Sequence, residues 1–276
     1  MKNKLKVFKF KLNKKIPIDI FLEKVLYEPS IGYYNNRVPF GKDGDFVTSP
    51  TISNLFSEIL AIWIISVWEK FEKPKIFNLV ELGPGDGSLM NILTQTFKRF
   101  PEFNKSVNIF LYEKSSLLIK IQKRRIENKH IKWIKNYNSI KKGPVIFFGN
   151  EFFDAIPIKQ FTVNNKIFLE KCFSINNKGL KETYKKASLS DVSLIKSFNI
   201  LNKQNFVEYP MLGFKELNKI LKKISALSGG VLLIDYGYLK PFNRNTLQTV
   251  MKNRKVKMEN LNNYIGKVDI TYLVNF

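Results

Sequence analysis

The chain alternates between short apolar runs and longer amphipathic stretches through most of its length. Apolar runs bounded by turn residues are typical of buried strands, whereas apolar residues spaced by three and four positions predict helices. The pattern predicts core strands at residues 77–82, 108–113, 130–134, 145–149 and 231–235, and helices at 88–100, 115–128 and 214–227. Strands that alternate with helices indicate an α/β fold with a doubly wound, Rossmann-like parallel sheet.

Two segments depart from this alternation. Residues 1–75 form an N-terminal helical and loop extension, with helices predicted at 18–26 and 53–71 and a turn-rich loop at 40–50. Residues 76–276 form the main domain, which carries an antiparallel β insertion at about 157–210. Strands are predicted there at residues 160–163, 166–173, 180–184 and 206–209, and the Asn-rich turns at 164–165 and 176–179 are hairpin signals.

The residues that follow Pro241 are polar and read as irregular. A doubly wound sheet of this kind usually ends in a further helix and two more strands. We therefore expect the C-terminal strands of the sheet to be missing from this chain.

A glycine-rich turn joins the first core strand to the helix that follows it. Its spacing is Gly83-x-Gly85-x-Gly87, one residue tighter than a dinucleotide-binding G-x-G-x-x-G. Glu81 lies two residues before the first glycine and suits a cationic, amino-acid-like ligand better than a pyrophosphate. The pattern resembles the first motif of class I S-adenosylmethionine-dependent methyltransferases. An ordinary strand-to-helix turn is the alternative interpretation.

A second acid, Glu113, ends the second core strand. In nucleoside-binding α/β sheets, an acid at this place accepts hydrogen bonds from the ribose hydroxyls. A solvated acid at a strand end is the alternative. Taken together, Glu81, the loop residues Gly83, Pro84, Gly85 and Gly87, and Glu113 are candidates to bind S-adenosylmethionine.

Composition narrows the possible partners. The net charge is +23, yet only six of the 46 basic residues are arginine and the lysines are scattered over every segment. This distribution gives a basic surface without a focused recognition patch, so we expect no specific nucleic-acid partner. One cysteine and one histidine leave no disulfide framework and no His/Cys metal cluster. The most apolar run, residues 55–68, is too short to be a transmembrane segment.

Several further motifs occur in one order along the chain. They are Gly32-Tyr33-Tyr34, the loop at 40–50, Ile52-Ser53 with Phe56-Ser57-Glu58 and Ala61-Ile62-Trp63, Glu81–Gly87, Asn150-Glu151-Phe152-Phe153-Asp154-Ala155-Ile156-Pro157, Ile234-Asp235-Tyr236-Gly237 and Asp269-Ile270-Thr271. From about residue 18 to the end, the chain resembles the MidA-like family of class I methyltransferases, which includes the mitochondrial complex I assembly factor.

The resemblance implies S-adenosylmethionine as cofactor and arginine on a protein partner as substrate, with a respiratory complex I subunit as the expected partner. It implies the cytoplasm for a bacterial chain and the mitochondrial matrix for a eukaryotic one. Carboxylates bind a guanidinium bidentately, so Glu151 and Asp154, just beyond the fourth strand, are the catalytic candidates. Asn150 is the candidate to orient the cofactor or substrate. Alternatively, Asn150 and Asp154 cap the next turn and Glu151 is solvated.

Two departures from the family keep other functions open. Asn253 stands where the family commonly has a histidine, and the portion that usually follows Asp-Ile-Thr is absent. A catalytically silent assembly factor that retains the fold therefore remains an alternative. Methylation of another nitrogen or of a small molecule is a second alternative. Amino-directed nucleic-acid methyltransferases often place Asn/Asp-Pro-Pro-aromatic after the fourth strand, and Asn150-Glu151-Phe152-Phe153 counts against that branch.

Overall fold

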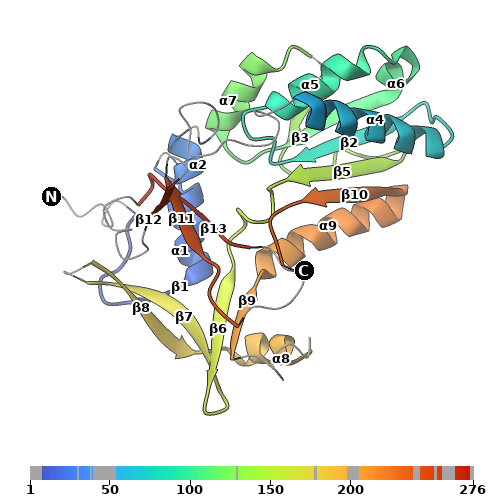
Figure 1. Ribbon diagram of the computed structural model, residues 1–276. Helices are drawn as coiled ribbons and strands as arrows, with labels where there is room; N and C mark the ends of the chain where they lie inside the picture. Colours follow the sequence, from blue (N-terminus) through green and yellow to red (C-terminus); the bar gives the residue numbers. More distant parts are fainter. Residues whose placement is uncertain are drawn as a thin grey trace. The chain divides into compact units, whose positions relative to one another are not determined.

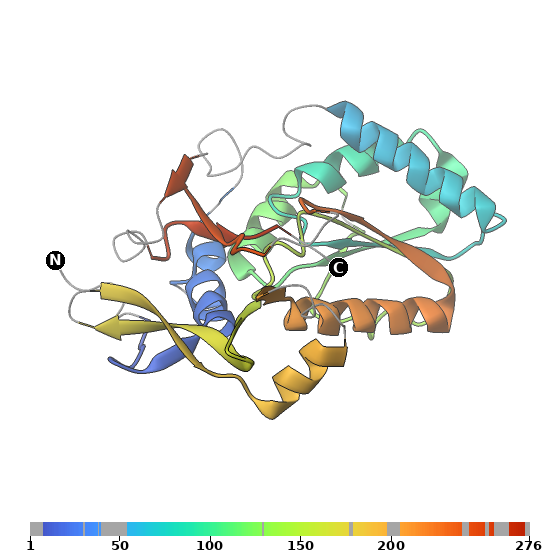
Figure 2. The same ribbon diagram turned by 60° about the horizontal axis from the view of Figure 1, so that its bottom comes forward.

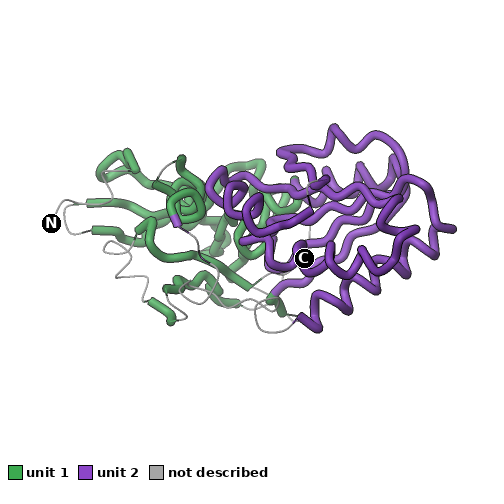
Figure 3. The backbone as a smooth tube through the Cα atoms, turned by 90° about the horizontal axis from the view of Figure 1, so that it is seen from above, with its two compact units in different colours: residues 1–36, 153–215, 236–276 green, residues 37–152, 216–235 purple. Residues whose placement is uncertain are grey.

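The computed structural model describes residues 8–29, 31–37, 39, 54–128, 130–176, 179–197, 205–238, 243–251, 254–256 and 265–273. The chain divides into two compact units, coloured separately in Figure 3. Unit 1 comprises residues 1–36, 153–215 and 236–276, and unit 2 comprises residues 37–152 and 216–235. The expected loop at 40–50 and Asn253 lie outside the described residues.

The described part of unit 2 is built on a five-stranded parallel sheet (Figure 1). The chain starts at the central strand β2, moves outward through β3 to β4, returns to β5 on the other side of β2, and ends at β10. The strands are β2 (Phe77–Leu82), β3 (Val107–Tyr112), β4 (Lys132–Ile134), β5 (Val145–Asn150) and β10 (Gly229–Ile234). Doubly wound sheets bind ligands at the carboxyl ends of the strands where this order reverses, here β2 and β5.

Helices cover both faces of this sheet because its central strands bury side chains on both sides. Leu79 of β2 packs in a cluster with α4 and α5, whereas its neighbour Val80 packs in a second cluster with Ile220 of α9. Successive strand residues point to opposite faces, so a strand covered on both sides is continuously apolar. The helices are α4 (Asn54–Lys70), α5 (Ser88–Phe97), α6 (Pro101–Ser106), α7 (Ser116–Arg125) and α9 (Met211–Leu227).

The strands and helices predicted for this sheet are confirmed, although most of their ends differ by one to three residues. The helix predicted at 88–100 ends at Phe97, because Pro101 starts the separate helix α6. Gly229 does more than end α9: it is the first residue of β10, paired with Val145 at a φ of +143°. A Cβ there would lie 1.8 Å from the Val145 carbonyl oxygen, so this strand start requires glycine.

Unit 1 contains an antiparallel sheet ordered β1-β7-β6-β9, with β8 paired to β7 (Figure 2). The four strands predicted in the insertion are confirmed, and the first hairpin turns on Asn165 and Lys166 at φ values of +47° and +63°. Two left-handed residues make a tight turn of the twist that hairpins favour. The strands are β1 (Lys15–Pro17), β6 (Lys159–Asn164), β7 (Ile167–Asn176), β8 (Gly179–Lys186) and β9 (Phe206–Tyr209).

Other parts of unit 1 were not predicted. The N-terminal strand β1 pairs with β7, directly before the expected helix α1 (Ile18–Tyr27). The short helices α2 (Tyr33–Asn36) and α8 (Leu189–Ser197) were missed. The irregular structure expected after Pro241 is wrong, because this part contains a small antiparallel sheet ordered β12-β11-β13. Its strands are β11 (Gln248–Met251), β12 (Arg254–Val256) and β13 (Asp269–Thr271), too short to show an alternating pattern.

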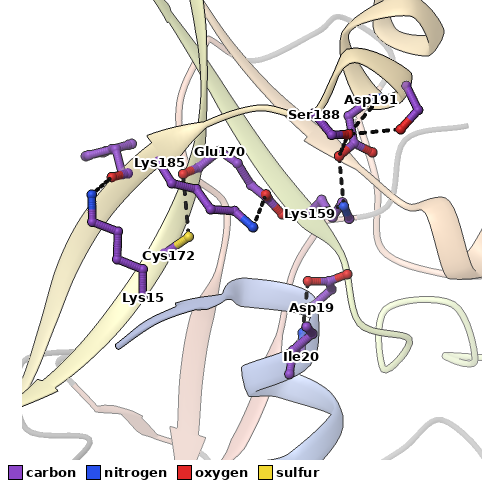
Figure 4. A network of polar contacts seen from close by, with 11 residues as sticks. Lys15, Asp19, Ile20, Lys159, Glu170, Cys172, Lys185, Ser188 and Asp191 are labelled. Atoms are coloured by element: carbon purple, nitrogen blue, oxygen red, sulfur yellow. Dashed lines mark hydrogen bonds and ion pairs between the residues drawn. The ribbon is translucent and has the colours of Figure 1, made fainter. Parts of the chain in front are cut away.

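A network of charged side chains joins several elements of unit 1 (Figure 4). The Lys159 ammonium on β6 lies 3.0 Å from Asp191 of α8 and 3.5 Å from the buried Glu170 of β7. Lys185 of β8 lies 2.9 Å from the other oxygen of Glu170. The attraction of the carboxylates, led by the hydrogen bond to Asp191, raises the pKa of Lys159 despite its burial. Lys159 thus stays charged and neutralises acids from separate segments.

We expect Lys159→Met to destabilise unit 1 by about 2 kcal/mol, because it leaves Asp191 and Glu170 without their shared cation. Urea unfolding of the whole chain at neutral pH measures the change. Lys98→Met is the matched control, because its ion pair with Glu127 is exposed and spans 4.0 Å. Its effect should stay below about 1 kcal/mol. Equal unfolding midpoints for the two variants would show that the network contributes no special stability.

Candidate cofactor and active site

The glycine loop lies at the carboxyl end of β2, where it turns directly into α5. Gly83, Gly85 and Gly87 all have left-handed backbones, with φ values of +61°, +55° and +84°. The Gly83 N–H donates to the Tyr112 carbonyl of β3 at 3.1 Å, and the Gly87 N–H donates to the Pro84 carbonyl at 2.8 Å. These bonds hold the turn so that α5 begins at the carboxyl edge of the sheet.

The space around the loop also requires glycine. A Cβ on Gly83 would lie 2.9 Å from the Phe152 ring, and a Cβ on Gly87 would lie 3.1 Å from the Ile126 side chain. Both the backbone angles and the close contacts therefore exclude ordinary side chains. A loop that keeps its backbone bare in this way can approach a ligand closely.

Asp86 supports the loop through both oxygens of its carboxylate. One carboxylate oxygen accepts the Ser88 N–H at 2.9 Å and so caps the start of α5. The other oxygen pairs with the Arg125 guanidinium of α7, which also donates to the Ser88 hydroxyl at 2.6 Å.

Glu81 is a buried carboxyl with one oxygen unsatisfied. The residue is 3% exposed, and its Oε2 finds no hydrogen-bond partner within the described part of the chain. Burial, with a smaller contribution from the negative charges of Asp86 and Glu113, raises the pKa of Glu81 to about 8. Leaving a buried polar group unsatisfied costs free energy, which a bound cation would recover.

Glu113 follows β3 and is held firmly in place. One of its oxygens accepts the Ser115 N–H at 2.7 Å, and the other accepts the Gln122 amide at 3.2 Å. Burial raises the pKa of Glu113, against these hydrogen bonds, which lower it. Each carboxylate oxygen can accept more than one hydrogen bond, so Glu113 retains capacity for ligand hydroxyls. Sequence reasoning missed Gln122, whose signal is only a polar residue on the buried side of α7.

Asn150 and Glu151 lie where β5 ends beside β10. Asn150 pairs with Ile234, so the next residues along the two parallel strands are Glu151 and Asp235. Glu151 has a φ of +54°, uncommon for a residue with a side chain, and its N–H donates to the Ile234 carbonyl at 2.8 Å. Burial, followed by the charge of Asp235, raises the pKa of Glu151, against a hydrogen bond with Asn150. Two partly buried carboxylates therefore share this edge.

Asp154 belongs to unit 1, and so does its hydrogen-bond partner Thr271. Its carboxylate accepts the Thr271 hydroxyl of β13 at 2.8 Å. The neighbouring backbone is held in the same way: Tyr272 donates to the Phe153 carbonyl and Tyr27 to the Ala155 carbonyl, both at 2.7 Å. The Asp-Ile-Thr motif is thus bonded to the segment that follows Phe152, and Asp154 has a structural partner.

Among the described residues, no helix is long and apolar enough to cross a membrane. The same residues contain no group of His, Cys, Asp and Glu side chains that could hold a metal ion.

The parallel sheet, the glycine loop at its switch point, Glu81 near the end of β2 and Glu113 directly after β3 define an α/β protein with a nucleoside-type binding edge. Residues 59–276 match the family described as "Putative S-adenosyl-L-methionine-dependent methyltransferase". Because the match covers most of the sequence, the chain belongs to this family.

Relatives and solved structures agree with this membership. The chain is 30% identical over 259 residues to the mitochondrial protein arginine methyltransferase NDUFAF7 of Xenopus laevis, covering 84% of this chain and 59% of that protein. The Xenopus tropicalis protein of the same name is 28% identical over 98% of this chain and 68% of its own. A crystal structure from Burkholderia thailandensis with bound S-adenosyl-homocysteine has a TM-score of 0.77 at 21% identity, covering 95% of this chain and 70% of that one. At that identity the likeness concerns the fold.

Proposed function

We propose that this protein transfers methyl groups from S-adenosylmethionine to arginine side chains of a protein partner. The observation that carries the proposal is the buried Glu81, whose Oε2 has no hydrogen-bond partner among the described residues, beside a left-handed glycine loop, with Glu113 directly after the next strand. Family membership supports the cofactor, and the names of the Xenopus relatives support the acceptor.

The residues of the sheet edge fit the proposed cofactor. The Glu81 carboxylate would bind the ammonium of the methionyl group. This ammonium would donate a hydrogen bond to the unsatisfied Oε2 and neutralise the buried negative charge. Gly83, Pro84, Gly85 and Gly87 would line the ligand with backbone atoms, and Glu113 would accept the ribose hydroxyls. Asn150 would orient the ligand from the end of β5. When bound, the sulfonium supplies an activated methyl group, so the protein must mainly position the acceptor.

Glu151 is the proposed contact for the acceptor. A guanidinium placed between Glu151 and Asp235 would oppose the two causes that raise the pKa of Glu151, which are burial first and the charge of Asp235 second. Its planar fork of N–H donors can bind a carboxylate bidentately. Asp154 remains the second catalytic candidate, although its bond to Thr271 competes for that role.

The proposal extends to the protein substrate and to the cellular compartment. A protein substrate follows from the arginine methyltransferase names of the relatives, and we keep a respiratory complex I subunit as the expected partner. The mitochondrial relatives favour the mitochondrial matrix for a eukaryotic chain, and the cytoplasm is proposed for a bacterial one. Cofactor binding without transfer to any arginine acceptor would favour the assembly-scaffold alternative.

Calorimetric titration with S-adenosylmethionine tests the proposed site. We expect the parent to bind and Gly85→Val to lose at least ~10-fold in affinity, about 1.4 kcal/mol. The reason is that a β-branched side chain strains the left-handed backbone of residue 85 and fills the approach to the ligand. Gly230→Ala is the matched control, since Gly230 lies at the start of β10, and it should bind like the parent. Unchanged affinity in folded Gly85→Val would remove the loop from the site.

A further inference from the structure

Gln122 connects the two halves of the candidate cofactor site through one side chain. It is fully buried in α7, and its amide nitrogen donates to the Gly85 carbonyl at 2.8 Å and to Glu113 Oε2 at 3.2 Å. Its amide oxygen accepts the Trp133 indole N–H at 2.8 Å. The same side chain therefore reaches the glycine loop after β2, the acid after β3 and the middle residue of β4.

We propose that Gln122 is the positioning residue that sets the glycine loop and Glu113 in register for the nucleoside, an inference that rests on the proposed function. Both hydrogens of the amide nitrogen are used, one on each half of the site. Trp133 fixes which way the amide faces, because an indole N–H can only donate and so requires the amide oxygen.

The loop needs such a contact because its own backbone is permissive. Glycine adopts many conformations, and the observed left-handed angles at Gly83, Gly85 and Gly87 hold only where surrounding bonds fix them. Within the described residues, Gln122 supplies the side-chain bond to Gly85, and its Cα also lies 3.3 Å from where a Cβ on Gly87 would stand. Losing the amide would leave the Gly85 carbonyl and one oxygen of Glu113 without a buried donor.

Affinity and melting temperature together distinguish a positioning role of Gln122 from a packing role. Leu118, one turn earlier on α7, is also buried, but its side chain has no group that can form a hydrogen bond. A packing defect should lower the melting temperature while folded molecules keep their affinity. A positioning defect should lower affinity out of proportion to the change in melting temperature.

The test compares Gln122→Met, which keeps length but has no donors, with Leu118→Ala in the same helix. The full chain is titrated with S-adenosyl-homocysteine by calorimetry, and each variant is melted without ligand. We expect Gln122→Met to lose at least ~10-fold in affinity, and Leu118→Ala to melt earlier but bind within ~2-fold of the parent. Trp133→Phe, which removes the indole N–H that orients the amide together with part of the ring volume, should lose about 3-fold.

The outcomes separate this inference from the function on which it rests. If the parent binds and both Gln122→Met and Trp133→Phe bind equally well, the positioning role is overturned while the cofactor assignment stands. If Gln122→Met does not fold, Trp133→Phe decides: weaker binding supports the role, and parent-like binding overturns it. If the parent itself does not bind, the proposed function fails, and the role of Gln122 fails with it.

Discussion

Replacement of Glu151 by Gln is expected to lower methyl transfer to an arginine-containing acceptor by about 100-fold, as when a positioning and electrostatic group is lost. The change removes charge but little volume, so fold and cofactor affinity should stay close to those of the parent. The left-handed backbone of residue 151 and its bond to Ile234 do not depend on the side-chain charge. Radiolabelled methyl transfer and cofactor titration on the same preparation measure the two effects separately.

Asp154→Asn is the comparison for this prediction. Its carboxylate accepts the Thr271 hydroxyl, and an amide oxygen can accept the same bond, so the fold should be retained. We expect a drop in transfer that is similar to or smaller than that of Glu151→Gln. Parent-like transfer by Glu151→Gln would remove the carboxylate from the mechanism and leave the methyl acceptor to be bound elsewhere.

Glu81→Gln is expected to weaken S-adenosylmethionine binding by about 100-fold near pH 8, because a charge-assisted hydrogen bond of roughly 1.5–3 kcal/mol is lost. Without ligand the pKa of Glu81 is about 8, so at lower pH much of the protein carries a neutral acid. A cationic ammonium favours the carboxylate, so binding should release a proton, and parent affinity should rise with pH toward 8. The variant cannot titrate and should show neither effect.

Calorimetry in buffers of different ionisation enthalpy measures the released proton. Glu102→Gln, an exposed acid on α6, is the matched control and should keep the pH dependence of the parent. The Glu81 carboxyl also affects the free energy of unfolding without ligand. Its folded pKa lies above the unfolded value of 4.5, so its contribution to stability is full below pH 4.5 and is lost as the pH rises through about 8. A pH-independent affinity in the parent would contradict this role.

The sheet and the loop could be predicted because their signals are local. Buried parallel strands are continuous apolar runs, and the three glycines occupy positions where left-handed backbones exclude other residues. β1 and β13 could not be predicted, since each is three residues long and exists only by pairing with a strand far away in sequence. Short strands of this kind are stabilised by tertiary pairing rather than by their own pattern.

Some residues of the candidate site could also be predicted from the sequence, and others could not. Glu81 and Glu113 are recognisable because each stands at a fixed place relative to a strand and a glycine loop. The coupling of Glu151 to Asp235 required the register of β5 against β10, and the bonds of Gln122 required the position of α7. The bond between Asp154 and Thr271 joins residues 117 positions apart, which no spacing rule anticipates.

The loop from Gly83 to Ser88 and the segment after β3 are proposed to bind an S-adenosyl nucleoside. Hydrogen–deuterium exchange with mass spectrometry, with and without S-adenosyl-homocysteine, measures whether the ligand protects these two segments. We expect slower exchange in the peptides that contain residues 83–88 and 113–115, and no change in those of β7 and β8. Protection confined to other segments, or no protection at saturating ligand, would contradict it.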